Sequence, residues 1–260
     1  MKKLYLVDIS SMFFRAFFAL PPSLTNDEGM PTNAVYGLLS MTIKLLRESQ
    51  PDYMAFCFDR KEPTFRHELY EEYKANREEM PEDLVPQLPY VRQLAEVLGI
   101  PQLDAEGYEA DDVIASLVRR GREKKLEVII VSGDKDLAQL IQPYVQMYDT
   151  MKDVTYDSEG VLAKWGVRPE QMGDYLSLVG DSSDNIPGVR GIGPKTAEKL
   201  LKEFDSLEGI YENLEAISAK GTQKKLKESK EQAFLSQKLV HLESGLSVIE
   251  SLDELRLKPF

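Results

Sequence analysis

The chain has 260 residues, of which 42% are hydrophobic and 29% charged, and these proportions are typical of a globular protein. Its 32 basic and 44 acidic residues give a net charge of −12, whereas proteins that bind nucleic acids usually carry a basic surface. The longest apolar runs, such as Val128–Val131, are too short to span a membrane. Composition alone therefore argues against both a membrane protein and a DNA-binding protein.

The N-terminal apolar run reaches only Val7 before Asp8 interrupts it, so we expect no signal peptide. The single cysteine, Cys57, lies in a strand-like apolar run and cannot form an internal disulfide. A buried, unreactive thiol is typical of a reducing compartment. We therefore expect a cytoplasmic protein.

Short apolar runs alternate with helix-length segments in the first half of the chain. The runs are short and bounded by polar or turn residues, which predicts buried strands over Leu4–Val7, Tyr53–Phe58 and Leu126–Val131. Apolar residues at helical spacing predict helices over Ala34–Glu48, Val91–Leu98 and Asp112–Arg120. Strands separated by helices predict an α/β fold with a central, mostly parallel sheet flanked by helices.

From about Val167 onward the strand-like runs disappear and the sequence becomes helical. Helices are predicted over Met172–Leu178 and Lys195–Lys202, on either side of a loop rich in Gly and Pro, and one long polar helix over Lys224–Leu242. We expect a catalytic α/β domain over residues 1–166 and a helical subdomain over residues 167–260. The charged segment Lys61–Met80 predicts an exposed helical excursion.

Each predicted strand ends in acidic residues. Asp8 and Asp59 follow the first two strands, and Asp134 and Asp136 follow the third. In open α/β sheets, ligands bind beyond the carboxyl ends of the strands. A further acidic group begins the helix that precedes the third strand and consists of Glu109, Asp111 and Asp112. We expect all these carboxylates to meet at one edge of the sheet.

Such a concentration of anions is unfavourable unless a cation neutralises it. Oxygen ligands suit Mg²⁺, with Mn²⁺ as a substitute, whereas two histidines and one cysteine make a zinc site improbable. Two ions roughly 3.5–4 Å apart suit phosphodiester hydrolysis, because they activate water and stabilise transition-state charge. Taken alone, Asp8 is better explained as the cap of a helix through Ser10–Phe18, but three strand-end acids together with an acidic helix start favour a metal site. A phosphatase with an aspartyl nucleophile is disfavoured, because Ser10 stands where such enzymes need a second Asp.

The segment Gly188–Ala197 has the form of a helix-hairpin-helix motif. Gly191 and Gly193 would permit a tight turn, and Pro194 suits the first position of a helix. The following backbone N–H groups and Lys195 would then bind phosphate without reading bases. An ordinary helix connector is the alternative. Just upstream, Asp181 and Asp184 would share one face of a helical turn and could complete a second metal site.

With these motifs, the sequence resembles the 5′ nuclease (flap endonuclease) family, in particular the N-terminal 5′–3′ exonuclease domains of bacterial DNA polymerases I. The resemblance runs from Met1 to Phe260. It is carried by five segments, namely Phe58–Arg66, Glu109–Asp112, Gly133–Asp136, Gly180–Gly188 and Gly191–Gly193. The resemblance implies a PIN-like 5′ nuclease fold with a helical arch at about residues 60–89 and the helix-hairpin-helix motif at about residues 180–204.

The resemblance also implies the ligands of two or more metal ions. The first site would comprise Asp8, Asp59, Glu109 and Asp111, and the second Asp134, Asp136, Asp181 and Asp184. Asp111 would lie near both ions, with Asp112 alongside as a further ligand. K⁺ is a candidate ion at the helix-hairpin-helix motif. The eight ligands of the two sites, without Asp112, account for most of the acidic excess of the chain, which removes the objection from net charge.

The resemblance places Tyr73–Arg77 in the arch, where Lys74 and Arg77 would stabilise the scissile phosphate and act with Asp111 in catalysis. Without the family, a solvated charged helix would be the better interpretation of this stretch. Arg15 is a candidate phosphate contact, whereas Phe13 and Phe14 are expected in the core rather than under a base. The predicted hairpin contacts to DNA are Gly188, Gly191, Gly193, Lys195 and Thr196.

These features predict a 5′–3′ exonuclease and flap endonuclease that cuts DNA at flaps, overhangs or nicks in replication and repair. RNA–DNA hybrids are a further candidate substrate, and a monomer is expected. The alternatives are a non-catalytic DNA junction-binding protein and a related RNA-directed nuclease, although the latter lacks the hairpin motif. The sequence is compatible both with a free-standing nuclease and with part of a longer polymerase.

Overall fold

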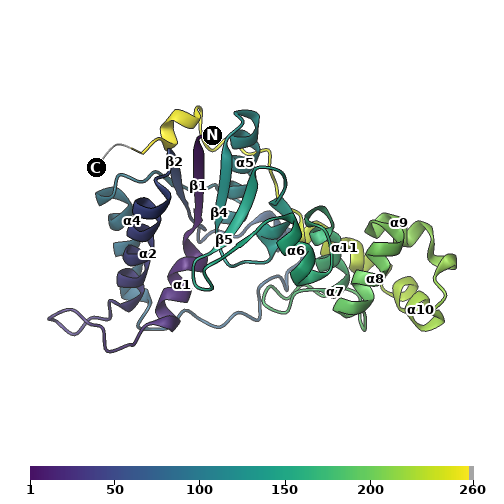
Figure 1. Ribbon diagram of the computed structural model, residues 1–260. Coiled ribbons are helices and arrows are strands. Elements are labelled where there is room, and N and C mark those ends of the chain that lie inside the picture. Colours follow the sequence, from purple (N-terminus) through teal and green to yellow (C-terminus); the bar gives the residue numbers. More distant parts are fainter. Residues whose placement is uncertain (258–260) are drawn as a thin grey trace.

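The computed structural model describes residues 1–257 and places the three predicted strands at the centre of a six-stranded sheet (Figure 1). The strand order is β3-β2-β1-β4-β5-β6, with every neighbouring pair parallel except β5 and β6. The strands are β1 (Lys3–Asp8), β2 (Tyr53–Cys57), β3 (Gln102–Leu103), β4 (Glu127–Val131), β5 (Val145–Asp149) and β6 (Val154–Tyr156). The predicted α/β fold with a mostly parallel sheet is confirmed.

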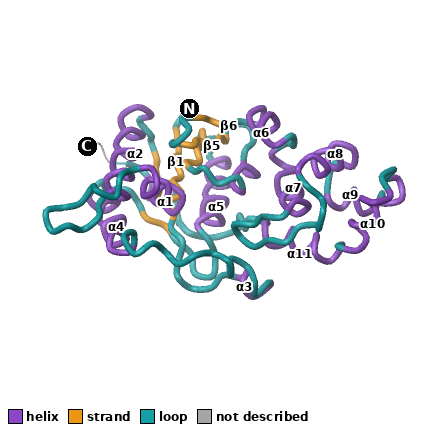
Figure 2. Tube along the Cα trace, turned by 90° about the horizontal axis from the view of Figure 1, so that it is seen from below, coloured by secondary structure: helices purple, strands orange, loops and turns teal. Residues whose placement is uncertain are grey.

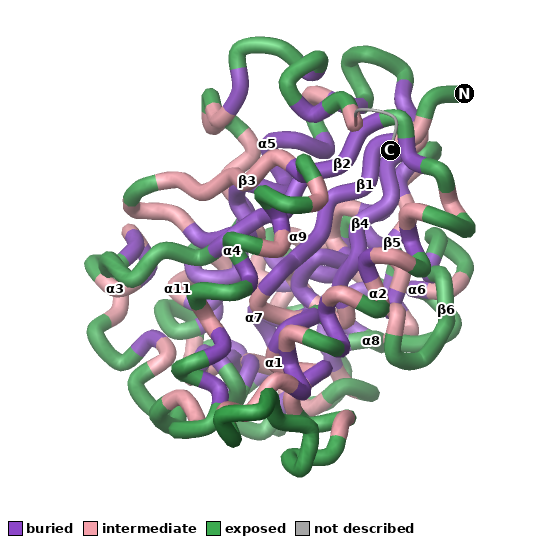
Figure 3. The backbone as a smooth tube through the Cα atoms, turned by 90° about the vertical axis from the view of Figure 1, so that its left-hand side faces the viewer, coloured by how far each residue is buried: buried purple, intermediate pink, exposed green. Residues whose placement is uncertain are grey.

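Side chains of β1 alternate between two hydrophobic clusters, as the period of two along a strand requires. Leu4 and Leu6 pack with α5 (Ala110–Glu123) on one face, whereas Tyr5 and Val7 belong to the opposite cluster. That opposite face is covered by α1 (Ile9–Ala19), α2 (Asn33–Ser49) and α4 (Leu88–Val97), and Figure 2 shows both layers around the strands. In Figure 3 the backbone of β1, β2 and β4 has the colour of buried residues. Both faces of the central strands are therefore packed against helices.

The carboxyl ends of β1, β2 and β4 lie at the edge of the sheet nearest α1, the lower edge in Figure 1. Asp8 ends β1 and caps α1, because its side chain accepts a hydrogen bond of 3.0 Å from the backbone N–H of Ser11. The helix that was predicted after Asp8 is thus present. Glu109 occupies the corresponding cap position at the start of α5.

A group of helices extends from one side of the sheet (Figure 1). It comprises α6 (Ser158–Trp165), α7 (Met172–Val179), α8 (Pro194–Phe204), α9 (Leu207–Glu212), α10 (Lys220–Glu228) and α11 (Lys230–Val240). Leu117 of α5, Leu176 of α7 and Leu239 of α11 belong to one hydrophobic cluster, so the helices share a core with the sheet. The single long helix predicted over Lys224–Leu242 is wrong, because the backbone leaves helical geometry at Ser229.

After α11 the chain returns along α5 to the sheet. The backbone N–H of Glu243 donates to Asp112, that of Leu246 donates to Ser116, and Leu257 donates to the carbonyl of Asp52 beside β2. The last three residues of the predicted 167–260 subdomain lie outside the described residues. Within residues 1–257, no helix combines the length and the apolarity needed to cross a membrane.

The predicted helical arch is mostly not helical. Its regular structure consists of α3 (Phe65–Leu69) and a short 3₁₀ turn over Val85–Gln87, while turns connect the two before α4 begins at Leu88. Most residues of Lys61–Met80 are exposed, as predicted, but the side chains of Arg66 and Tyr73 are almost fully buried. Lys74 has a left-handed backbone (φ 57°), which breaks any helix there.

Candidate metal centre and nucleic-acid interface

A cleft of about 680 Å³ lies at the carboxyl ends of β1, β2 and β4. Four cationic side chains line it, namely Arg15, Lys74, Arg77 and Lys135. Six of the nine acids predicted as metal ligands also line it, namely Asp8, Asp59, Glu109, Asp111, Asp134 and Asp184. The structure thus gathers residues that are far apart in the sequence into one site rich in both signs of charge.

Short hydrogen bonds hold the two acids that follow β1 and β2. Asp8 is 4% exposed and accepts a 2.7 Å bond from the hydroxyl of Ser132, the residue that follows β4. Asp59 accepts one bond of 2.6 Å from the hydroxyl of Ser10 and one of 2.9 Å from the backbone N–H of Ala110. Three strand ends and the start of α5 are therefore tied together through these two carboxylates.

Asp134 and Asp136 follow β4, and the carboxylate of Asp134 accepts a 3.0 Å bond from the backbone N–H of Asp136. Asp136 is 8% exposed, and its Oδ1 atom is buried without a hydrogen-bond partner. A buried carboxylate oxygen with no donor is rare in folded proteins, and it marks a place where a cation would be favoured.

The predicted helical turn over Asp181 and Asp184 is absent. The segment is instead a tight turn closed by backbone hydrogen bonds between Asp181 and Ile186, with Asn185 in a left-handed conformation (φ 55°). Both carboxylates are nevertheless buried and face the β4 loop or the residues of the predicted arch. The tight turn directs Asp181 toward Lys135 and Asp184 toward Lys74 and Arg77.

Asp112 does not fit the predicted role of a metal ligand. Its Oδ1 atom accepts bonds from Arg66 and from the backbone N–H of Glu243, and its Oδ2 atom accepts bonds from Arg66 and from the N–H of Glu109. Four donors use the full capacity of a carboxylate. Asp112 instead fixes the backbone of Glu109, and sequence alone did not reveal Arg66 as its partner.

Burial and mutual repulsion raise the pKa of several of these carboxylates, because both disfavour the charged form. Burial, together with the charges of Asp59 and Asp134, raises the pKa of Asp8 to about 7. Burial and neighbouring carboxylates raise the pKa of Asp111 and of Asp136 well above the ordinary range. A divalent cation would relieve this repulsion, and an all-oxygen donor set suits Mg²⁺ or Mn²⁺.

Cationic side chains of the protein already contact part of this set. Lys74 donates a 2.5 Å bond to Glu109 and lies 3.6 Å from Asp184, and Arg77 donates a 2.6 Å bond to Asp184. Lys135 donates a 2.6 Å bond to Asp181. Within residues 1–257, no three His, Cys, Asp or Glu side chains already lie at metal-ligand spacing. The acids surround the cleft, but some must reorient before they can share an ion.

Two buried groups of the arch segment escaped the sequence analysis. The hydroxyl of Tyr73 lies 3.1 Å from Glu109 and 3.2 Å from Asp184, so it joins one acid of each predicted metal site. Lys135 was also missed, although its position between Asp134 and Asp136 was a usable signal. Arg66, which lies 3.5 Å from Glu109, had no such signal.

Arg15 points from α1 into the cleft, and its guanidinium pairs with Asp149 at 2.9 Å. A Cβ atom added to Gly133 would lie 1.9 Å from that guanidinium, so the arginine crosses directly over the glycine. Phe13 is 2% exposed and belongs to the core, as predicted, whereas Phe14 is half-buried and lines the cleft.

The hairpin between α7 and α8 depends on close approach of two glycines. A Cβ atom on Gly188 (φ 60°) would lie 2.4 Å from the backbone nitrogen of Gly180, so only glycine fits there. Gly191 has a left-handed backbone (φ 80°), whereas Gly193 is extended and borders open space. Pro194 is the first residue of α8, as predicted, and Lys195 beside it is exposed. The start of α8 is thus free to meet a phosphate.

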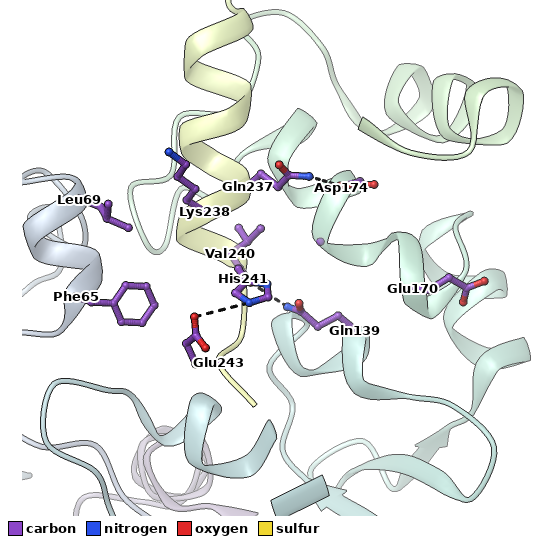
Figure 4. A pocket seen from close by; sticks show the side chains of 11 residues that line it. Phe65, Leu69, Gln139, Glu170, Asp174, Gln237, Lys238, Val240, His241 and Glu243 are labelled. Carbon is purple, nitrogen blue, oxygen red and sulfur yellow. Dashed lines mark hydrogen bonds and ion pairs between the residues drawn. The ribbon is translucent and has the colours of Figure 1, made fainter. Parts of the chain in front are cut away.

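A second hollow, of about 540 Å³, lies between α3, α7 and α11 (Figure 4). Phe65 and Leu69 form one wall, and Gln237, which is bonded to Asp174 at 3.1 Å, lies opposite them (Figure 4). None of the residues predicted for metal or DNA binding lines this hollow. The chemistry predicted from the sequence therefore belongs to the cleft beside the strand ends.

Comparison with known proteins gives two family matches and many relatives. Residues 3–166 match the family described as 5′-3′ exonuclease, N-terminal resolvase-like domain, and residues 167–260 match 5′-3′ exonuclease, C-terminal SAM fold. A 5′-3′ exonuclease of Aquifex aeolicus is 42% identical over 258 residues, which cover 99% of this chain and 88% of that protein. DNA polymerase I of Caldicellulosiruptor bescii is 45% identical over 98% of this chain. The chain spans only 31% of that polymerase.

Among solved structures, the flap endonuclease of bacteriophage T5, in a pseudo-enzyme–product complex with DNA and metal ions, has a TM-score of 0.78. The similarity covers 98% of this chain and 96% of that protein, at 24% sequence identity. At this identity the similarity establishes the fold.

Proposed function

The chain belongs to the 5′–3′ exonuclease family. We therefore propose that it hydrolyses DNA phosphodiesters at junctions between single and double strands. It would act as a divalent-metal-dependent 5′–3′ exonuclease and 5′ flap endonuclease in replication and repair. Flaps, overhangs and nicks are the proposed DNA substrates, with RNA–DNA hybrids as a second substrate class. We propose that it works as a monomer in the cytoplasm.

One observation carries this proposal: six predicted metal ligands and four cationic side chains line a single cleft at the strand ends. A phosphodiester needs both kinds of group, because cations must stabilise the charge on the phosphate while carboxylates hold the metal. The backbone N–H of Lys74 also donates to the carbonyl of Asp184, which stands four residues before Gly188 in the chain, and this supports a hairpin loop near the cleft. DNA held by the hairpin would therefore reach the cleft.

We assign two groups of metal ligands in the cleft, with Mg²⁺ as the natural ion and Mn²⁺ as a substitute. Asp8, Asp59, Glu109 and Asp111 would hold one ion, and Asp134, Asp136, Asp181 and Asp184 the other. Bound ions would supply an activated water and charge stabilisation at the phosphate. The unpartnered Oδ1 atom of Asp136 and the raised pKa of Asp111 support this donor set.

The remaining roles belong to cationic and backbone groups. Lys74 and Arg77 would bind the scissile phosphate once they leave Glu109 and Asp184, and Arg15 would contact a neighbouring phosphate. Gly191, Gly193, Lys195 and Thr196 would bind the duplex backbone, with Gly188 holding the loop in shape and K⁺ as a candidate ion at this hairpin. We further propose that residues 1–166 form the catalytic unit and residues 167–260 the DNA-holding unit.

The test is cleavage of a DNA duplex that carries a labelled 5′ single-stranded flap, compared with blunt duplex and with free single strand. We expect Mg²⁺-dependent cleavage near the junction of the flapped duplex, and little cleavage of the other two. Tight binding of the flapped duplex without cleavage would instead identify a non-catalytic junction-binding protein. Equal cleavage of all three substrates would contradict the proposed selectivity for junctions.

A further inference from the structure

Lys135 occupies a distinctive place in the cleft, between two carboxylates that we assign to the second metal ion. Its ammonium nitrogen lies 2.6 Å from Oδ2 of Asp181 and 3.9 Å from Oδ1 of Asp136. The lysine comes from the loop after β4, and Asp181 comes from the turn after α7. The ammonium thus joins the two segments that supply the proposed second metal site.

The oxygens that Lys135 approaches have no other strong partner among the described residues. Oδ1 of Asp181 accepts bonds from the backbone N–H and the hydroxyl of Ser183, at 2.9 Å and 2.6 Å, whereas Oδ2 accepts only the bond from Lys135. Oδ1 of Asp136 is buried and accepts no hydrogen bond at all. One lysine therefore bonds to one oxygen and lies near a second, both of which a metal ion would also need.

We propose that Lys135 competes with a divalent ion for the carboxylates of Asp136 and Asp181, and thereby sets the affinity of the second ion. This inference rests on the proposed nuclease function and its two groups of ligands. Lysine suits such a role because its charge sits on a flexible chain that can swing away, whereas an arginine fork would hold a carboxylate more rigidly. Lys135 is also 34% exposed, so it has room to move into the cleft.

Lys135 differs in this respect from the other cations of the cleft. Lys74 contacts Glu109 and Asp184, which we assign to different ions, and Arg77 contacts Asp184 alone. Among these three, only Lys135 contacts two acids of the same proposed ion site. Lys135 is therefore not assigned a catalytic role, because it acts through the ion that it displaces.

The inference predicts that removing the charge of Lys135 tightens binding of one ion and not of the other. A charge-assisted hydrogen bond of this kind is broken when the ion enters, so the Lys135→Met variant should bind the second ion about tenfold more tightly. The Lys135→Arg variant keeps the charge and holds the carboxylate more rigidly, so it should not bind the second ion more tightly than the wild-type protein does. The first ion should bind all three proteins alike.

The probe is Mn²⁺ without DNA, and the free ion is measured by electron paramagnetic resonance during a titration. The matched control is Lys44→Met, because Lys44 also pairs with an aspartate, Asp153 at 3.6 Å, but lies on α2 away from the cleft. This control removes the same charge from the protein. Adding Asp181→Asn to Lys135→Met should abolish the tightened site, which identifies the ligands involved.

Each outcome separates the inference from the function on which it rests. If Lys135→Met binds the second Mn²⁺ no more tightly than Lys44→Met does, the competition is refuted even though the metal site stands. If the wild-type protein binds no Mn²⁺ that depends on Asp111 or Asp181, the proposed metal site itself fails. Thermal unfolding of each variant, followed by circular dichroism, checks that the binding data come from folded protein.

Discussion

The guanidinium of Arg66 and the carboxylate of Asp112 form a two-pronged ion pair, with N–O distances of 2.7 Å and 2.8 Å, in the interior of the protein. Arg66 is 1% exposed, and it also donates to the carbonyls of Leu239 and His241 at the end of α11. Asp112 in turn holds the backbone N–H of Glu109. The pair therefore links three parts of the fold: the arch segment, the start of α5 and the end of α11. Through Glu109 it also contacts the group of proposed metal ligands.

Breaking this buried pair should strongly destabilise the fold. Replacing Asp112 by Asn removes the carboxylate that pairs with Arg66 through two bonds and leaves only Glu109 at 3.5 Å, which should cost about 3–5 kcal/mol of unfolding free energy. Urea denaturation measures the loss. The control is Asp205→Asn, which removes an exposed partner of Arg168 and should cost about 1 kcal/mol or less. Equal losses in both variants would contradict the structural role of the pair.

Asp112→Asn also tests the corrected role of this residue. Because both oxygens of Asp112 are fully used by Arg66 and backbone groups, the variant should bind as many Mn²⁺ ions as the wild-type protein at a temperature where it stays folded. If the folded variant binds fewer Mn²⁺ ions than the wild-type protein, Asp112 is a metal ligand after all.

Two glycines of the hairpin loop should respond to alanine in opposite ways. Gly188→Ala forces a Cβ atom to within 2.4 Å of Gly180 in a left-handed backbone, and we expect a loss of about 1–3 kcal/mol in unfolding free energy. Gly193→Ala meets open space and should leave stability unchanged. If Gly193 faces a DNA backbone, its variant should bind duplex more weakly while folding normally. Unfolding curves and DNA-binding isotherms of the two variants check this contrast.

The Arg15–Asp149 pair should make stability depend on pH on the acidic side. Burial raises the pKa of Asp149, but the charge and hydrogen bond of Arg15 outweigh it and hold that pKa below its usual value. The pair therefore adds stability above the ordinary aspartate pKa of about 4, and this stability is lost as the pH falls through the lower folded-state value. The difference in unfolding free energy between wild type and Asp149→Asn should be large at pH 7 and small at pH 3. A difference that is the same at both pH values would contradict the assignment.

Gly133→Ala should detach Arg15 from Asp149 without removing either charge. The added methyl group would overlap the guanidinium, which must swing out of its present position. We expect the variant to bind flapped DNA as weakly as Arg15→Met does, because both lose the same placed cation. DNA-binding isotherms in Ca²⁺, which supports binding without a requirement for turnover, provide the comparison. Wild-type affinity of Gly133→Ala would show that the position of Arg15 does not matter.

Local patterns in the sequence predicted the central strands and the acids that follow them. The strands are recognisable because they are short buried apolar runs, and the helix starts because their residues are typical of capping and first-turn positions. Asp8 and Pro194 occupy the predicted positions at helix starts. The missed strand Val145–Asp149 alternates buried and half-buried residues, which weakens its apolar signal. Partners that are distant in the sequence could not be predicted. Arg66 pairs with Asp112, and Tyr73 bonds to Glu109 and Asp184, and these contacts exist only in the folded chain. The charge of the arch segment therefore predicted its exposed residues correctly, but it could not predict the burial of Arg66 and Tyr73.

Asp111 offers the most direct test of the metal-dependent chemistry. Its carboxylate lines the cleft, and the negative charges of Asp134, Asp8 and Asp59 act on it and raise its pKa. The measurement is the single-turnover rate of flap cleavage in Mg²⁺, together with the affinity for the same flapped DNA in Ca²⁺. For Asp111→Asn, we predict a rate lower by at least about a hundredfold with DNA affinity unchanged or slightly higher, because one ligand is lost while the DNA contacts remain. Cleavage at the wild-type rate by folded Asp111→Asn would contradict the account.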